Sequence, residues 1–214
     1  MAQGHSASSD TGFDRVSGVY DILTWLVFGN KLHDAQIIYL HRIPPYAIIL
    51  MIGGGSGWLL REVLRRCKPR QIIYIEASAR MLAKARKAVQ EDGRVVFRLG
   101  NETVINPSER VDVVITPFFL DLFTEERLAT SIVLRLRQTL KAGGLWLVSD
   151  FVQTNSWWQR LLLKVMYVFF GLTAGIEARR WPNWPRLLQQ SGLQSGEQQE
   201  RVSGQVITGW WAAS

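Results

Sequence analysis

The chain has 214 residues, a formal net charge of +7 and a single cysteine, Cys67. A chain of this length forms one domain with a substantial buried core. One cysteine excludes an internal disulfide and is compatible with a reducing cytoplasm, where we expect the protein to reside. The three histidines, His5, His33 and His41, form no clustered His/Cys ligand pattern, so we expect no metal site.

Two further observations concern the ends and apolar stretches of the chain. Residues 1–12 are small and polar without an apolar core, which predicts a disordered tail and excludes a secretory signal. The longest uncharged apolar stretch in the C-terminal half, residues 165–176, is too short to span a membrane as a helix. We therefore expect one domain over residues 13–214, with cap helices over about 13–43.

The most informative segment is an apolar run, residues 47–52, that leads into a glycine-dense turn. The glycines of this turn are Gly53, Gly54, Gly55 and Gly57. An amphipathic segment begins at Trp58, so the pattern predicts a buried parallel strand that feeds a helix N-terminus. Backbone without Cβ atoms lets a ligand approach closely, and the helix start favours polar or anionic groups. We expect a nucleoside-like or carboxylate-bearing ligand here.

The spacing of the glycines separates the ligand classes. A phosphate-binding P-loop requires Gly-Lys-Ser/Thr, where this chain has Gly57-Trp58-Leu59. A dinucleotide fingerprint, G-x-G-x-x-G, requires glycine where Trp58 or Leu60 stands, which argues against a nicotinamide-dependent oxidoreductase. The pattern present is G-x-G-x-G, and in it the chain resembles the class I S-adenosylmethionine-dependent methyltransferases.

The next predicted strand, residues 71–75, ends at Glu76, 19 residues beyond Gly57. A carboxylate at the end of a strand can accept hydrogen bonds from both hydroxyls of a ribose, and dinucleotide folds place such an acid about 20 residues beyond the glycine turn. A helix follows from Ser78. The resemblance implies that Glu76 binds the ribose and that Ala77 and Met81 also contact the cofactor.

Two further strands follow in the order of the family. After the strand over residues 95–99 come Asn101 and Glu102, where the resemblance places contacts with the adenine. The family usually has an acidic residue where Asn101 stands; the side-chain oxygen of Asn101 can still accept a hydrogen bond from the adenine amino group. After the strand over residues 111–116, the resemblance places Thr116 and Phe118 at the mouth of the site.

The remaining elements complete the predicted fold. Thr124 is a plausible N-cap for a helix running to Leu140. Residues 140–150, which open with Leu-Lys-Ala-Gly-Gly, resemble the family's helix end, glycine cap and fifth strand. Residues 193–201 and 205–213 are extended runs around a turn, which predicts a hairpin at the sheet edge. We expect a Rossmann-like, doubly wound α/β sheet of seven strands, mostly parallel, with an antiparallel C-terminal hairpin strand and helices on both faces.

One position departs from the family pattern. Methyltransferases of this class commonly have Asp or Glu two residues before the first loop glycine, where it helps to hold the amino group of the cofactor. This chain has Met51 there. Contacts to the methionine end then depend on backbone amides and carbonyls, and a cofactor-binding domain without catalysis is an alternative.

Segments outside these motifs are expected to define the methyl acceptor. The spacing of Phe13-Asp14 to Tyr20-Asp21 loosely resembles the start of the ubiquinone/menaquinone C-methyltransferase group, in which Tyr20 would close over the cofactor. Residues 152–186 form an apolar insertion that would cover the substrate as a lid. We expect a small, lipophilic acceptor, quinone-like or another aromatic or lipid metabolite, and contact of this insertion with the surface of a membrane.

The chemistry at the acceptor is left open by the sequence. Candidate general bases are Tyr20, His33, Asp150 and Tyr167, and spacing selects none of them, so we assign no catalytic residue. Basic residues fall mainly on the predicted helices, where such charges usually form solvated faces. Thr116-Pro117-Phe118 only faintly resembles the motif of base N-methyltransferases, which disfavours a nucleic-acid substrate. A nucleic-acid or protein N-methyltransferase is the alternative function.

Overall fold

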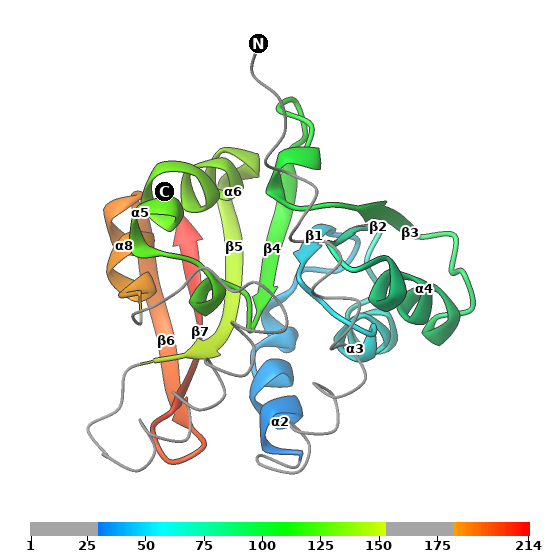
Figure 1. The fold of residues 1–214 in the computed structure, drawn as a ribbon, viewed down its shortest axis with the longest axis horizontal. Coiled ribbons are helices and arrows are strands. Elements are labelled where there is room, and N and C mark those ends of the chain that lie inside the picture. Colours follow the sequence, from blue (N-terminus) through cyan, green and yellow to red (C-terminus); the bar gives the residue numbers. More distant parts are fainter. Residues whose placement is uncertain (1–29, 153–181) are drawn as a thin grey trace.

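The computed structural model describes residues 30–152 and 182–214. The centre of the molecule is one seven-stranded sheet (Figure 1). The strands are β1 (Ile48–Ile52), β2 (Gln71–Glu76), β3 (Val95–Leu99), β4 (Val111–Pro117), β5 (Leu140–Phe151), β6 (Leu193–Arg201) and β7 (Val206–Ala213). Their order across the sheet is β3-β2-β1-β4-β5-β7-β6. The first five strands pair in parallel, and β7 pairs antiparallel with both β5 and β6. The predicted fold class is confirmed.

The helices alternate with the strands. They are α2 (Lys31–Ile37), α3 (Trp58–Cys67), α4 (Ala79–Ala88), α5 (Glu125–Arg127), α6 (Val133–Thr139) and α8 (Trp184–Gln190). Short 3-10 turns are η1 (Leu40–Arg42), η2 (Glu102–Val104) and η3 (Leu120–Leu122), and the π-helical turn η4 (Leu128–Ile132) joins α5 to α6. In Figure 1, α3 and α4 lie at the right of the view, and α5, α6 and α8 lie at the left.

Two apolar clusters cover the two faces of the sheet. Alternate residues of a strand point to opposite faces, so Met51 joins one cluster while Leu50 and Ile52 join the other. The Met51 cluster includes side chains of η1, α3 and α4; the second includes side chains of η4, α6 and α8. The five central strands read as nearly continuous apolar runs because helices cover both faces.

The helix predicted from Thr124 is present, and the side chain of Thr124 accepts a hydrogen bond from Arg127 N. Its end differs from the prediction. The helix stops at Thr139, and Leu140 already pairs with Val111 in the sheet. The register then jumps to Val113 beside Leu145. Gly143, with φ +69°, lies within this irregular stretch of β5, so it accommodates a bulge and does not cap the helix.

The predicted C-terminal hairpin is confirmed by β6 and β7. In the turn between them, Val202, Ser203 and Gly204 all have positive φ angles. The last residues of the predicted insertion behave differently from a lid. Trp184 opens α8, is fully buried, and packs edge-on against Trp211 with ring centroids 5.5 Å apart. The rest of that insertion, and residues 13–29 of the predicted cap, lie outside the described residues.

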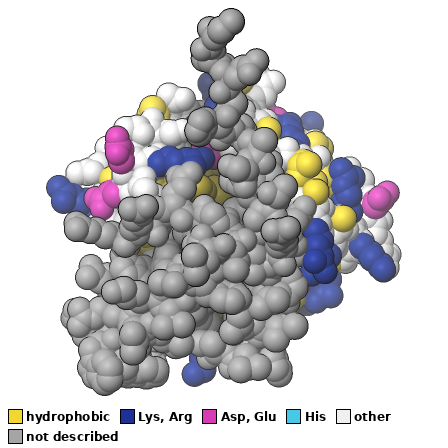
Figure 2. Space-filling model, in the orientation of Figure 1, with side chains coloured by type: hydrophobic (Ala, Val, Ile, Leu, Met, Phe, Trp, Pro, Cys, Tyr) yellow, Lys and Arg dark blue, Asp and Glu magenta, His cyan; other side chains and the backbone are white. Residues whose placement is uncertain are grey.

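Lys and Arg side chains surround α3 and α4. Dark-blue side chains gather at the right of Figure 2, where Figure 1 places these helices. Glu62 forms ion pairs with Arg65 and Arg66 at 2.7 and 2.8 Å on the outer face of α3. Arg65 and Arg66 are exposed, as expected for a solvated face, and Glu62 is half-buried beside them. In the described part of the chain, no helix is long and apolar enough to cross a bilayer, and no three potential metal ligands come together.

Candidate cofactor site

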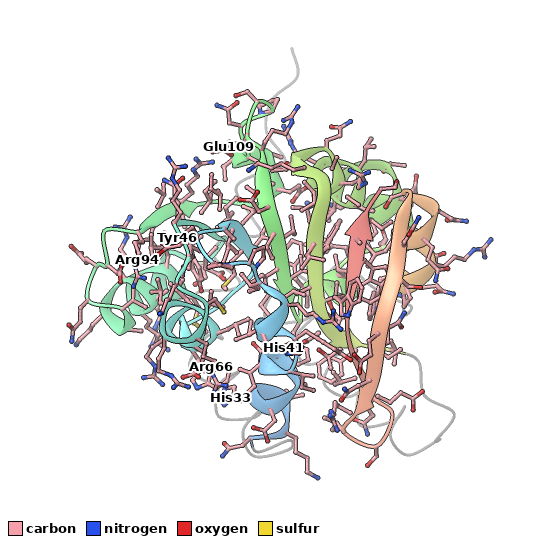
Figure 3. The ribbon with its side chains drawn as sticks, turned by 180° about the vertical axis from the view of Figure 1, so that it is seen from behind. His33, His41, Tyr46, Arg66, Arg94 and Glu109 are labelled. Atoms are coloured by element: carbon pink, nitrogen blue, oxygen red, sulfur yellow. The ribbon has the colours of Figure 1, made fainter. Side chains whose placement is uncertain are left out.

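The carboxyl ends of the parallel strands form one edge of the sheet, and the predicted site residues gather there. Figure 3 shows the orientation: Glu109, which precedes β4, lies near one end of the molecule, and His33 on α2 lies near the other. The glycine loop, residues 53–57, follows β1 and leads directly into α3. Ligands of open α/β sheets bind at this edge, beside the point where the strand order reverses.

The glycines of the loop have different neighbours. A Cβ atom on Gly54 would lie 2.6 Å from the ring of Tyr74, and one on Gly57 would lie 2.7 Å from the Cα atom of Ala85 in α4. A Cβ atom on Gly53 would lie 2.7 Å from the ring of Phe119. A Cβ atom on Gly55 would meet no atom of the described residues within 4 Å. Three of the four glycines are therefore needed for packing within the protein, and among the described residues only Gly55 borders the open space that a ligand requires.

Glu76 joins the glycine loop to the start of α4. Its Oε2 atom accepts a hydrogen bond from Gly55 N at 2.9 Å, and its Oε1 atom accepts one from Ser78 N at 3.0 Å. The residue is 8% exposed. A carboxylate oxygen has two acceptor positions, so one that accepts from a backbone amide can also accept from a ribose hydroxyl. The predicted ribose ligand thus also holds two backbone amides in place.

The start of α4 carries the other two residues predicted on this side. Ser78 is the N-cap, and its hydroxyl oxygen accepts a hydrogen bond from Met81 N at 3.1 Å. Met81 is buried and Ala77 is half-buried. Ala77 lies directly beyond Glu76, and Met81 lies in the first turn of α4. They fit a role as apolar neighbours of a nucleoside.

The structure changes the chemistry expected of Asn101. Its Oδ1 atom accepts from both the backbone N–H and the hydroxyl of Thr103, at 3.0 and 2.7 Å, and so caps η2. Both acceptor positions of this oxygen are occupied. The side chain therefore offers its NH2 group, a donor, and the expected acceptance from the adenine amino group conflicts with this geometry. A donor here suits a ring nitrogen of a base.

Glu102 is engaged inside the fold. It is 2% exposed, and its Oε1 atom lies 3.2 Å from the guanidinium of Arg127 at the end of α5. Its carboxylate ties η2 to the helix after β4. Its Oε2 atom is buried and has no hydrogen-bond partner among the described residues.

Of the two residues predicted at the end of β4, Thr116 lies in the core and Phe118 is half-buried. Thr116 is fully buried, and its hydroxyl oxygen accepts from Trp146 Nε1 at 3.0 Å, so a cofactor contact from this side chain conflicts with its burial. Phe118 is half-buried, with a φ of +48°, and donates its N–H to Ser149 O at 2.7 Å. A left-handed phenylalanine is uncommon, and it turns the chain sharply at the end of β4.

Asp150 fixes the loop after this turn. Its Oδ2 atom accepts from Phe119 N and Leu120 N at 3.0 and 2.7 Å, and its Oδ1 atom accepts from Phe151 N. Complete burial, and then the adjacent carboxyl of Asp121, raise the pKa of Asp150 well above its usual range. A group enclosed in this way does not reach a substrate, which removes Asp150 from the candidate bases.

The other candidate bases divide between described and undescribed parts of the chain. His33 stacks on Trp58, the first residue of α3, with ring centroids 3.8 Å apart and planes 10° apart. This stack places α2 against the helix that follows the glycine loop. Tyr20 and Tyr167 lie outside the described residues, so the predicted closing role of Tyr20 stays a prediction.

Met51 is fully buried in the cluster on the α3–α4 face of the sheet. Its thioether is a weak acceptor and carries no charge, so it does not replace the acidic residue that the resemblance leads us to expect. The sequence pattern also missed Tyr74, whose hydroxyl donates to Gly55 O at 2.8 Å. The available signal was a single polar side chain within an otherwise aliphatic strand, Ile72 to Ile75.

Comparison with known proteins agrees with this geometry. A family model described as "Methyltransferase domain" matches residues 49–144. No curated protein matches the chain by sequence.

Three solved structures illustrate the similarity of fold. A chain from the complex between the Haloferax volcanii Trm112 methyltransferase activator and the putative methyltransferase has a TM-score of 0.70 at 16% identity, over 94% of this chain and 97% of that one. Burkholderia thailandensis 1,6-didemethyltoxoflavin-N1-methyltransferase, with S-adenosylhomocysteine bound, has the same TM-score and identity over 100% of this chain and 92% of that one. A Planctomyces limnophilus O-methyltransferase family 2 protein in complex with apigenin has a TM-score of 0.69 at 16% identity, over 98% of this chain and 66% of that one.

The residues present fit the cofactor of such enzymes. The open space at Gly55, the acceptor capacity of Glu76 and the start of α4 at Ser78 provide a cradle for a nucleoside with a polar tail. The strand order and the match of residues 49–144 to a methyltransferase domain agree with S-adenosylmethionine as the cofactor.

Proposed function

We propose that this methyltransferase acts on a small, lipophilic acceptor, quinone-like or another aromatic or lipid metabolite. The observation that carries the proposal is an apolar cluster at the carboxyl end of β5, which we call the edge cluster. Its buried members are Leu32, Ala35, Phe151 and Val206, and Phe118 and Val202 pack against it. All six side chains are apolar, and α2, β5 and β7 bring them together at the edge that carries the cofactor site.

The two aromatic residues of the edge cluster, Phe118 and Phe151, contact each other. The rings of Phe118 and Phe151 are 5.2 Å apart, and Phe118 follows the end of β4, the strand next to β1 and the glycine loop. An acceptor placed against Phe118 therefore meets an apolar surface on one side and the cofactor on the other. This arrangement favours an apolar or aromatic acceptor over a charged one.

When bound, S-adenosylmethionine supplies a methyl group that its sulfonium already activates. The protein has to hold the donor, align the acceptor and exclude water. Glu76 and the glycine loop hold the nucleoside and its tail. Phe118 and Phe151 provide the apolar side of the site. We assign no general base.

Two solved structures of the same fold support a small-molecule acceptor. The toxoflavin N1-methyltransferase contains bound 1,6-didemethyltoxoflavin, and the O-methyltransferase family 2 protein contains apigenin. Contact of the 152–186 insertion with a membrane, and a cytoplasmic location, stay predictions, because residues 153–181 of that insertion lie outside the described residues.

The test is to follow the methyl group. Purified protein with S-adenosylmethionine labelled in the methyl group is incubated with an extract of the source cells. We expect label in organic-extractable small molecules, which mass spectrometry then identifies. Glu76→Ala serves as the control that lacks the ribose ligand. Label confined to acid-precipitable RNA or protein overturns the proposed acceptor class and establishes the nucleic-acid or protein alternative.

A further inference from the structure

The buried tyrosine of β2 is the most unusual polar group at this edge. Tyr74 is fully buried among aliphatic side chains, and its hydroxyl donates to the carbonyl oxygen of Gly55 at 2.8 Å. Two residues further along the same strand, Glu76 accepts from Gly55 N at 2.9 Å. Residues two apart on a strand point to the same face, so β2 holds both backbone polar groups of Gly55. The peptide planes on either side of Gly55 are thereby fixed.

The ring of Tyr74 also determines which residues the loop can contain. It packs so closely under Gly54 that a Cβ atom there would lie 2.6 Å from the ring and from its hydroxyl oxygen. On its other side, the ring of Phe97 meets it edge-on at 5.6 Å. The loop therefore lies on a rigid aromatic support, and Gly55 is left facing open space.

Tyr74 stands next to the position at which the chain departs from the family pattern. Met51 of β1 pairs in register with Tyr74 of β2, and both are fully buried in the same cluster. Where a carboxylate is expected, this chain therefore has a thioether, and a phenol hydroxyl on the neighbouring strand contacts the loop.

We propose that Tyr74 is a positioning residue that compensates for the missing acid at Met51 by fixing the glycine loop for the amino-acid end of S-adenosylmethionine. This inference rests on binding of that cofactor at the loop, on which the proposed function also rests. Tyr74 acts through Gly55 and is not itself expected to touch the cofactor.

The chemistry of the group suits this role. Burial, and then the negative charge of Glu76, raise the pKa of Tyr74 well above its usual value. The hydroxyl thus keeps its proton, and stays a donor, to a higher pH than an exposed tyrosine does. A carboxylate at Met51 would in contrast have to remain charged at a fully buried position.

The experiment removes the single oxygen atom with Tyr74→Phe and measures binding by calorimetry. The variant keeps the ring under Gly54, so we expect it to fold. We expect dissociation constants for S-adenosylmethionine and S-adenosylhomocysteine to rise about five- to tenfold, the effect of one lost hydrogen bond. Binding of 5′-methylthioadenosine, which lacks the amino-acid end, should weaken by less than about twofold. Amide hydrogen exchange at Gly55 and Ser56 should become faster.

Tyr39→Phe is the matched control. Tyr39 is a buried tyrosine of the same cluster, located just before η1, and its loss of a hydroxyl should leave all three affinities unchanged. If wild type binds S-adenosylmethionine and Tyr74→Phe binds it equally well, the positioning role is overturned. An equal loss for 5′-methylthioadenosine also overturns it, because the effect would then concern the nucleoside. No binding by wild type overturns the proposed function instead.

Discussion

The two halves of the carboxyl edge are built in different ways. In the β1–β2 half, a short stretch of sequence carries the glycine loop, Tyr74 and Glu76. The side chains of Tyr74 and Glu76 on β2 hold the backbone of the loop that follows β1. In the β4–β5 half, Asp150 holds Phe119 and Leu120 from 30 residues away. The partners are 19 and 21 residues apart in the first half and 30 and 31 residues apart in the second, and only the first half carries a glycine motif. A sequence motif therefore predicts cofactor binding, and no motif predicts the part of the site that faces the methyl acceptor.

α2 joins the second half through contacts that are still more distant in sequence. The hydroxyl of Thr208 on β7 donates to Ala35 O at 3.0 Å and shares a hydrogen bond with Ser149 on β5 at 2.7 Å. These contacts place Leu32 and Ala35 against Phe151 in the edge cluster. Substitutions in the β1–β2 half should change cofactor affinity as well as stability, and those in the β4–β5 half should change stability and its pH dependence.

The largest effect is expected for Met51→Glu. The side chain is fully buried, and restoring the family's acid would bury a carboxylate in an apolar cluster, at a cost of about 3 kcal/mol or more in the free energy of unfolding. Urea denaturation measures the loss. Met51→Leu, which conserves volume, should cost less than about 1.5 kcal/mol. A stable Met51→Glu variant with tighter cofactor binding would show that this buried position tolerates the acid.

Glu76→Ala should affect both binding and stability. Loss of the ribose acceptor should weaken S-adenosylmethionine binding by about 1.5–3 kcal/mol, the scale of a hydrogen bond to a charged group. Gly55 N and Ser78 N also lose their acceptor, at about 1–3 kcal/mol for each amide that stays buried and unpaired. Calorimetry and thermal denaturation measure the two effects separately. Unchanged affinity in the folded variant would exclude Glu76 as the ribose ligand.

The Asp121–Asp150 pair predicts a pH dependence of stability. The folded-state pKa of Asp150 is raised, so between its unfolded and folded values the native state binds more protons than the unfolded state. Stability should therefore fall as pH rises through that window, by up to about 1.4 kcal/mol per pH unit. Urea denaturation from pH 4 to 9 measures the slope.

Two isosteric variants separate the members of this pair. Asp121→Asn removes the neighbouring charge and supplies a permanent donor, so the slope should flatten. Asp150→Asn keeps the shape but directs an NH2 group toward the backbone donors that Asp150 accepts from, and should be destabilised at every pH. Equal slopes in wild type and Asp121→Asn would show that the two carboxyls are not coupled.

The smallest effect is expected at Asn101. Asn101→Ala removes the cap of η2 and should cost about 1 kcal/mol in stability. Asn101→Asp keeps the cap and restores the family's acid, so stability should be unchanged. Because the NH2 donor is lost, binding of S-adenosylmethionine should not improve if Asn101 donates to the base. Tighter binding by Asn101→Asp would show that an acceptor is preferred at this position.

The β1–β2 half could be predicted well from sequence because its determinants are local. The glycine turn, the strand end at Glu76 and the N-cap Ser78 each follow from a few neighbouring residues. Glycine spacing did not reveal that Gly54 and Gly57 face protein side chains and only Gly55 faces open space. That distinction depends on Tyr74 and Ala85, which approach the loop from β2 and α4.

The β4–β5 half was predicted less well. Thr116 and Glu102 are both placed near the cofactor by resemblance, yet their side chains are bound to Trp146 and Arg127 inside the fold. The helix predicted to end in a glycine cap ends at Thr139, because Leu140 already pairs with β4. Each outcome depends on a partner far away in the chain, and no local pattern specifies that partner.

The sequence by itself determined the alternation of strands and helices, the antiparallel hairpin and the identity of the cofactor, since apolar periodicity and glycine spacing act over short distances. Tertiary structure alone decided which polar groups face the ligand and which serve the core. Tyr74 holds the loop and Asp150 is enclosed because strands adjacent in the sheet bring side chains within hydrogen-bond distance of backbone groups elsewhere in the chain.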